Sequence, residues 1–394
     1  MSQSTLKNAH REEQGQATPE NRVHKRTFFC PGKLRQAEGL HHFCRMRSSL
    51  FLILLLALCS CGNEIPEGQQ LTVCVGKIAV REQAGEKSRA LRTVSAGENL
   101  VALGRVSNFI SAIRLGDSLL QAPWIEVSGK GLPSGWVFAA AVRPREADFD
   151  EWFLQQQMRC FWGADLAERR NKWLAARSAL KTANDAAAYY RETVALRDAC
   201  MARLSSRSEP NEADVDPDFF WLNKALPGCI TQRGSGKNEV FSFIDYHVWQ
   251  QIAGSTAGNQ DDIFINFCLT EFPLDSIESP YPSWTIQTAE KEGSSRLGSG
   301  KHLDMLQLIE DGLVISPLFT KEYLACKKLI MNDILNQGNT YWLSADKIRG
   351  EIDQIAARGF KCLDERDLLA LQERRKQFDD PAANGIRVNL RAGE

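Results

Sequence analysis

The sequence predicts a multi-domain protein in which a small all-β barrel (71–145) precedes a helical hairpin or bundle (146–205) and an α+β domain (218–380). Three observations support this prediction. Residues 71–142 combine β-branched runs with frequent glycines, which is typical of short strands in a barrel. Residues 147–205 contain a single glycine, Gly163, and are rich in helix formers. Beyond residue 218, strand-like runs come before helix-like runs, as in α+β folds.

The length and charge of the chain limit its class. Its 394 residues are enough for two or three domains. Residues 1–60 carry nine Lys and Arg against four Asp and Glu, so residues 61–394 hold 39 basic and 45 acidic side chains, a net charge of −6. Nucleic-acid binding needs a basic surface, and we therefore expect no nucleic-acid partner.

The N-terminal residues indicate an export signal. The apolar run at 50–58 is too short to span a membrane but fits the apolar core of a secretory signal, with Arg47 before it. We expect Met46 to be the true start of translation. Residues 1–45 would then be an over-long gene model, and the alternative is a disordered extension.

The end of this run, Leu-Cys-Ser-Cys at 58–61, resembles the lipobox of bacterial lipoproteins, although Cys59 departs from the usual Ala, Ser or Thr. The resemblance implies that 46–60 is a lipoprotein signal peptide, that Cys61 receives a diacylglyceryl group and an N-acyl chain such as palmitate, and that 61–70 is a tether. Two or more acyl chains anchor a protein stably. Gly62, where inner-membrane retention signals often have Asp, implies an outer-membrane address in the bacterial cell envelope. An ordinary secretory signal is the alternative.

Export would make disulfide bonds the natural use of the remaining cysteines. Seven follow Cys61, so at least one is free or pairs between chains. They show no metal-ligand spacing, and only two histidines remain past Cys61, so we expect no metal and no cofactor. The alternative is buried reduced thiols. The disulfides that we expect are Cys160–Cys200, Cys229–Cys268 and Cys326–Cys362.

The barrel segment resembles the bacterial SH3-like (SH3b) domain over about seventy residues. The resemblance rests on Ala-Val-Arg-Glu-Gln-Ala-Gly at 79–85, the run to the turn glycine at 91–97, Trp-Ile-Glu-Val at 124–127 and Gly-Trp-Val at 135–137. Ala79 and Ala84 depart from the usual Asn and Pro, and residues 107–123 are an insertion.

This resemblance implies a binding domain, because family members commonly bind cell-wall peptides or partner proteins. A small barrel offers a shallow groove and no deep pocket that excludes water. The candidate ligand-binding side chains are Trp124, Trp136 and Phe138, and the alternative for the tryptophans is packing in the core.

The helical segment shows three apolar stripes with steps of three and four residues, which predict a hairpin or three-helix unit. It is either a spacer, a partner-binding bundle or a scaffold packed on the C-terminal domain. We expect the basic cluster at 169–172 to be a solvated face. The stripes are Phe149, Trp152, Phe153 and Cys160; Leu166, Trp173, Leu174 and Leu180; and Tyr189, Thr193, Leu196, Cys200 and Leu204.

After a polar linker at 206–217, the α+β domain is predicted to begin with strands and to end with helices. Gly312, Gly338 and Gly359 lie where three of the helices should end, and Ser344 is a good N-cap. Residues 381–394 have the composition of a tail. The predicted strands are 240–245, 263–269 and 283–288, and the predicted helices are 301–311, 320–337, 344–358 and 364–378.

No catalytic site is predicted. Cys268 precedes His302 in the order that a thiol–imidazole pair requires, but it lies in an apolar run where an inert buried thiol is the better interpretation. His247 follows an acidic residue without an obvious nucleophile. The two Gly-Ser-Gly-Lys repeats, at 234–237 and 298–301, lack the Walker spacing and are interpreted as turns with solvated lysines.

The sequence therefore predicts a noncatalytic envelope lipoprotein. It would be held on the membrane by a lipid anchor and would bind peptidoglycan or another envelope protein. Two alternatives stay open: a cell-wall hydrolase or other periplasmic enzyme with its site in the C-terminal domain, and a solute-binding lipoprotein.

Overall fold

The computed structural model describes residues 65–116, 118–205, 219–233, 240–273, 282–286 and 294–388. The expected signal peptide, Cys61, the 206–217 linker and the first Gly-Ser-Gly-Lys repeat lie outside these residues. Within the described part of the chain, no helix is long and apolar enough to cross a membrane.

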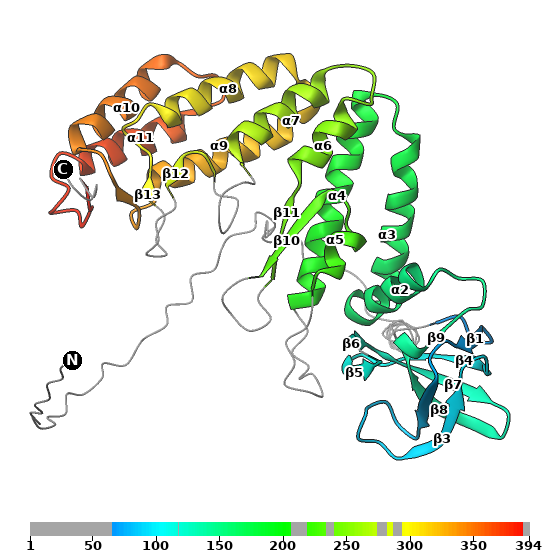
Figure 1. The fold of residues 1–394 in the computed structure, drawn as a ribbon. Coiled ribbons are helices and arrows are strands. Elements are labelled where there is room, and N and C mark those ends of the chain that lie inside the picture. Colours follow the sequence, from blue (N-terminus) through cyan, green and yellow to red (C-terminus); the bar gives the residue numbers. More distant parts are fainter. Residues whose placement is uncertain are drawn as a thin grey trace, which may run out of the picture. The chain divides into compact units, whose positions relative to one another are not determined.

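The first part of the described chain is a seven-stranded antiparallel sheet with the strand order β3-β2-β8-β7-β4-β1-β9. Figure 1 shows these strands in blue and cyan. The predicted strand runs and the turn near Gly97 are confirmed, because local alternation and glycine turns specify them. The strands are β1 (Gln70–Val73), β2 (Lys77–Arg81), β3 (Ala90–Ser95), β4 (Asn99–Val106), β7 (Trp124–Gly129), β8 (Leu132–Phe138) and β9 (Val142–Arg143).

The insertion at 107–123 forms a separate two-stranded hairpin of β5 (Ser111–Leu115) and β6 (Ser118–Ala122). It contacts the sheet core through Trp124, whose indole N–H donates to the Ser111 hydroxyl at 2.7 Å. A buried indole needs such an acceptor, so the hairpin satisfies a polar group of the sheet.

Gly135 allows β2 and β8 to lie close together. A Cβ atom at this position would be 2.7 Å from Cγ1 of Val80 and 3.0 Å from the carbonyl oxygen of Arg81. The glycine of the Gly-Trp-Val block is therefore a packing requirement of the sheet.

The segment at 149–205 forms the three predicted helices, α2 (Phe149–Trp162), α3 (Ala164–Ala176) and α4 (Ala183–Ser205). They share one hydrophobic core with the C-terminal elements. The ring of Tyr190 packs edge-on against Phe264, and Arg191 forms an ion pair with Glu322 at 2.7 Å. These contacts favour a scaffold packed on the C-terminal domain over a spacer.

The basic cluster at 169–172 was expected to be a solvated face, and this prediction is wrong for Arg170. The Arg170 side chain is only 3 % exposed and donates to the carbonyl oxygens of Ala225 and Lys224, at the end of α5 (Trp221–Ala225). Burial lowers the pKa of Arg170. A guanidinium can supply several donors to helix-end carbonyls, which explains its burial.

The C-terminal part mixes helices with small sheets. The strands after α5 form a two-stranded sheet, β10-β11, and a three-stranded sheet, β12-β13-β14 (Figure 1). The strands are β10 (Cys229–Arg233), β11 (Val240–Ile244), β12 (Thr285–Ile286), β13 (Ser294–Ser295) and β14 (Thr340–Tyr341). The helices are α6 (Tyr246–Ala253), α7 (Gln260–Glu271), α8 (Lys301–Ile315), α9 (Thr320–Leu335), α10 (Ala345–Arg358) and α11 (Glu365–Gln377).

The predicted strand at 263–269 is wrong, because these residues lie in α7. Asp261 and Asp262 occupy the first turn of that helix, where carboxylates are favourable. A short apolar run does not distinguish a buried strand from a buried helix. The predicted strand at 240–245 is confirmed by β11. Of the predicted strand at 283–288, Thr285–Ile286 form β12, residues 283–284 lie in a turn, and residues 287–288 are outside the described residues.

The last three helices have nearly the predicted first and last residues. Asp364 caps α11 with a capping box, and Gly359 ends α10 in the left-handed conformation. Of the expected tail, the structure describes residues 381–388. Arg387 pairs with Thr340, and Ile386 is buried.

Gly312 was predicted to end the helix at 301–311, but it lies inside α8. A Cβ atom there would be 2.4 Å from Cζ of Tyr323, so the glycine lets α9 pack closely. The Tyr323 ring is itself held by Phe264 and Phe267, with centroids 5.4 and 5.2 Å away.

This close approach gives a prediction with a matched control. Gly312→Ala should lower the free energy of unfolding by about 1–2 kcal/mol, because overpacking outweighs the better helix propensity of Ala. Gly350→Ala, in α10 with nothing within 4 Å of the added atom, should raise it by about 0.5–1 kcal/mol. Urea unfolding followed by circular dichroism checks both, and shifts of the same sign would contradict the packing argument.

Candidate functional site

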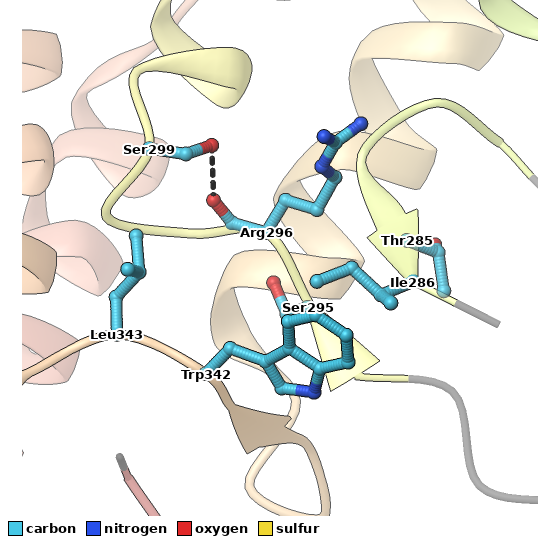
Figure 2. A pocket seen from close by; sticks show the side chains of 7 residues that line it. All are labelled: Thr285, Ile286, Ser295, Arg296, Ser299, Trp342 and Leu343. Atoms are coloured by element: carbon cyan, nitrogen blue, oxygen red, sulfur yellow. Dashed lines mark hydrogen bonds between the residues drawn. The ribbon is translucent and has the colours of Figure 1, made fainter. Parts of the chain in front are cut away.

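A cavity of about 370 Å³ lies where the β12-β13-β14 sheet meets the turns that follow β13 and β14. β12 pairs with β13 antiparallel, and β13 pairs with β14 parallel through Ser295 and Tyr341. This pairing brings segments far apart in the chain around one space (Figure 2). The lining residues are Thr285, Ile286, Ser295, Arg296, Ser299, Trp342 and Leu343.

Arg296 is the one charged residue among those that line the cavity. Its side chain is exposed, and its Nη1 donates to the carbonyl oxygen of Ser283 at 3.1 Å. It forms no ion pair with any carboxylate in the described part of the chain. The remaining guanidinium N–H groups are therefore available to an anion.

Of the other lining residues, three are apolar and three carry hydroxyl groups. Trp342, Leu343 and Ile286 are partly buried. The Ser299 hydroxyl donates to the backbone carbonyl of Arg296 at 2.6 Å, which holds the turn after β13 (Figure 2). Ligand sites commonly combine apolar walls with a few polar groups in this way.

The Ser295 side chain on β13 belongs to a buried polar network centred on Asp333. Ser295 Oγ donates to Asp333 Oδ2 at 2.6 Å, and His302 Nε2 lies 2.8 Å from the same oxygen. Asn339 Nδ2 donates to Asp333 Oδ1 at 2.9 Å. The Ser295 hydroxyl is thus hydrogen-bonded to a carboxylate and not to the imidazole, so the arrangement is not the serine–imidazole pair of a serine nucleophile.

The second Gly-Ser-Gly-Lys turn, at 298–301, forms an anion-binding loop at the start of α8. The backbone N–H groups of Gly298 and Gly300 donate to Glu351 Oε2 at 2.5 and 3.0 Å. Those of His302 and Leu303 donate to Oε1 at 2.8 and 3.1 Å. The anion at this helix N-terminus is a carboxylate of the chain itself, which leaves no place for a phosphate.

Lys301 in this turn was expected to be solvated, but it forms an ion pair. Its Nζ lies 2.8 Å from Oε2 of Glu271, a side chain that is only 1 % exposed. The pair neutralises a carboxylate that burial would otherwise disfavour.

The predicted ligand-binding aromatics of the N-terminal sheet differ in accessibility. Trp124 and Phe138 are 0 % exposed and pack edge-on with centroids 5.7 Å apart, so they are core residues and cannot reach a ligand. Only Trp136 is partly exposed. Arg105 lies over its ring at 5.6 Å and pairs with Glu126, opposite Trp136 in the sheet.

The cysteines lie mostly in the core. All seven described cysteines are free thiols, and none of the three expected pairs is bonded in the structure. Burial raises the pKa of Cys200, Cys229, Cys326 and Cys362 to about 12. It raises the pKa of Cys268 well above its usual value.

Cys268 and His302 do not form a catalytic pair. His302 is 0 % exposed and directs Nε2 at Asp333, while the electrostatic partners of Cys268 are Cys326, Tyr246 and acidic residues. His247 is exposed at the start of α6, and its backbone N–H donates to Asp245, the N-cap. No group of three or more His, Cys, Asp or Glu suited to a metal ion occurs among the described residues.

Comparisons with known proteins found no matching family model, no matching curated protein and no matching solved structure. The cavity must therefore be interpreted from its own residues. Sequence reasoning missed Arg296 and Trp342, because neither belongs to a motif and they lie 46 positions apart. The Gly-Ser-Gly-Lys turn beside Arg296 was the only local indication of this region.

The Glu351 cap yields a stability prediction. Glu351→Gln should lower the free energy of unfolding by about 2–3 kcal/mol, because one amide oxygen replaces a buried carboxylate that accepts four N–H groups. Glu365→Gln, on the exposed first turn of α11, is the control and should leave the urea midpoint nearly unchanged. Equal midpoints for the two variants would contradict the capping role.

Thiol reactivity tests the interpretation of Cys268. Burial raises the pKa of both Cys74 and Cys268, but only Cys74 is exposed. Cys268 should therefore resist alkylation in the native protein at mildly alkaline pH, while Cys74 is modified. Mass spectrometry after native alkylation, and again after unfolding without reductant, measures both states. Rapid native labelling of Cys268 would restore it as a nucleophile. Failure to label after unfolding would instead reveal a disulfide.

Proposed function

We propose that this protein is a noncatalytic ligand-binding protein of the bacterial cell envelope, held by lipid on Cys61. The observation that supports binding over catalysis is the cavity beside β13. It is lined by three apolar residues and by Arg296, which has no ion pair among the described residues. Ser295, His302 and Glu351 beside it are engaged in internal hydrogen bonds.

The enzyme alternative, a cell-wall hydrolase or another periplasmic enzyme, has lost its best candidates. A cysteine nucleophile reacts as the thiolate, and Cys268 is buried with a raised pKa. A general base must reach its nucleophile, and His302 is fully buried against Asp333.

The cavity favours the solute-binding alternative as the second candidate function. Its volume of about 370 Å³ falls within the range of pockets for small molecules. A lipoprotein that binds a small envelope solute would need no catalytic group. Such a function is compatible with the lipid anchor.

The N-terminal sheet is proposed to be an SH3-like domain that binds peptidoglycan or an envelope protein. Its blocks at 79–85, 124–127 and 135–137 support this assignment. Of the three candidate aromatics, Trp136 is the one whose ring can contact a partner. Arg105, 69 % exposed above this ring, adds a cation to the same surface.

The envelope address can be tested at Cys61. We expect the wild-type protein to incorporate labelled palmitate and to sediment with outer membranes. Cys61→Ser should abolish both, because the thioether cannot form. Cys59→Ser is the matched control and should retain both. Palmitate incorporation that persists in Cys61→Ser would contradict the proposed anchor.

Wall binding has a separate test. The soluble protein from residue 65 onward, without the lipid, is expected to sediment with purified sacculi, and Trp136→Ala should reduce the bound fraction several-fold. Arg114→Ala, on the separate β5-β6 hairpin, is the control. Wild-type protein that stays in the supernatant would count against peptidoglycan as the partner and leave an envelope protein.

A further inference from the structure

We propose that the cavity beside β13 binds a small ligand with a single carboxylate and an adjoining apolar group, the carboxylate on Arg296 and the apolar group against Trp342. This inference rests on the proposed binding function and names its ligand class. It depends on three features of the cavity: its charge, the groups that are already occupied, and its walls.

The charge of the cavity selects an anion. Arg296 is its one charged lining residue, and it is not neutralised by any carboxylate of the described residues. One N–H group donates to the Ser283 carbonyl oxygen, and the others have no hydrogen-bond partner among the described residues. A guanidinium matches the two oxygens of a carboxylate with two parallel hydrogen bonds.

The occupied groups favour a carboxylate over a phosphate. Phosphate sites usually add backbone N–H groups at a helix N-terminus to a cationic side chain. The adjacent helix N-terminus, that of α8, is filled by Glu351. Lys301, the nearest cation in that turn, is paired with Glu271. Among the described residues that line the cavity, Arg296 is the remaining cation, and a single cation balances a monoanion.

The walls select the rest of the ligand. Trp342, Leu343 and Ile286 place an indole and two aliphatic side chains around the same space (Figure 2). An indole face binds rings and apolar chains, and its burial by a ligand adds to the binding energy. The cavity volume suits a molecule of a few tens of atoms at most, such as a small aryl acid or the C-terminal end of a peptide.

The experiment compares matched probes by titration calorimetry with the protein from residue 65 onward. The probes are 3-phenylpropionate, its neutral amide and phenyl phosphate. N-acetylated alanyl-phenylalanine with a free carboxylate distinguishes a peptide end from a small free acid. The free acid should bind at least about tenfold more tightly than the amide, because the amide forfeits the charge-assisted pair.

Variants assign the effect to the proposed residues. Arg296→Gln should weaken binding of the acid by about tenfold or more and remove the preference for the acid over the amide. Arg296→Lys keeps the charge but cannot form the two parallel hydrogen bonds, so its affinity for the acid should lie between those of the wild type and Arg296→Gln. Trp342→Leu should weaken the acid and the amide equally. Arg366→Gln, exposed on α11, is the control and should bind like the wild type.

The outcomes separate this inference from the proposed function. Equal affinity for the acid and the amide, or tighter binding of phenyl phosphate, would overturn the carboxylate assignment. Absence of binding by every probe in the millimolar range would overturn the ligand class. In either case, sedimentation with sacculi and palmitate incorporation test the envelope function independently. The amide comparison uses wild-type protein, so it does not depend on the folding of any variant.

Discussion

The C-terminal part of this protein depends on one buried carboxylate. Glu351 on α10 accepts four backbone N–H groups from the turn at 298–301 and the start of α8, where the N-cap residue, Gly300, has no side chain to do so. A helix begins with N–H groups that lack partners, and its dipole favours negative charge there. Glu351 provides both the hydrogen-bond acceptors and the negative charge. It also connects α10 to the start of α8, about fifty residues earlier in the chain.

The same turn fixes the rim of the cavity. It follows directly from β13 and Arg296, and its neighbour Ser295 is tied through Asp333 to His302 on α8. Asn339, just before β14, is tied to Asp333 as well. Residues that resemble catalytic groups in the sequence therefore serve to hold three segments together. Arg296 at the rim, by contrast, has no acidic partner among the described residues. The polar groups of the network thus have a structural role, while the guanidinium of Arg296 can accept a ligand.

Burial makes the same distinction among the aromatic residues of the N-terminal sheet. Trp124 and Phe138 are directly paired between β7 and β8, and their rings fill the core. Trp136 keeps part of its ring in solvent beneath Arg105. Gly135, beside it, lets β8 approach β2 more closely than any side chain would permit. A Gly-Trp-Val block thus combines a packing requirement with one exposed ring.

The sequence by itself determined the elements whose causes are local. These are the strands between glycine turns at 70–143, the three helices at 149–205, and the last helix, which Asp364 caps. Tertiary structure decided the rest. It made 263–269 a helix, because an apolar run suits either element, and it placed Gly312 inside α8, because the reason for that glycine is the ring of Tyr323. Arg296 and Trp342 share a cavity only because β13 pairs with β14, and no local pattern encodes a contact between residues so far apart in the chain.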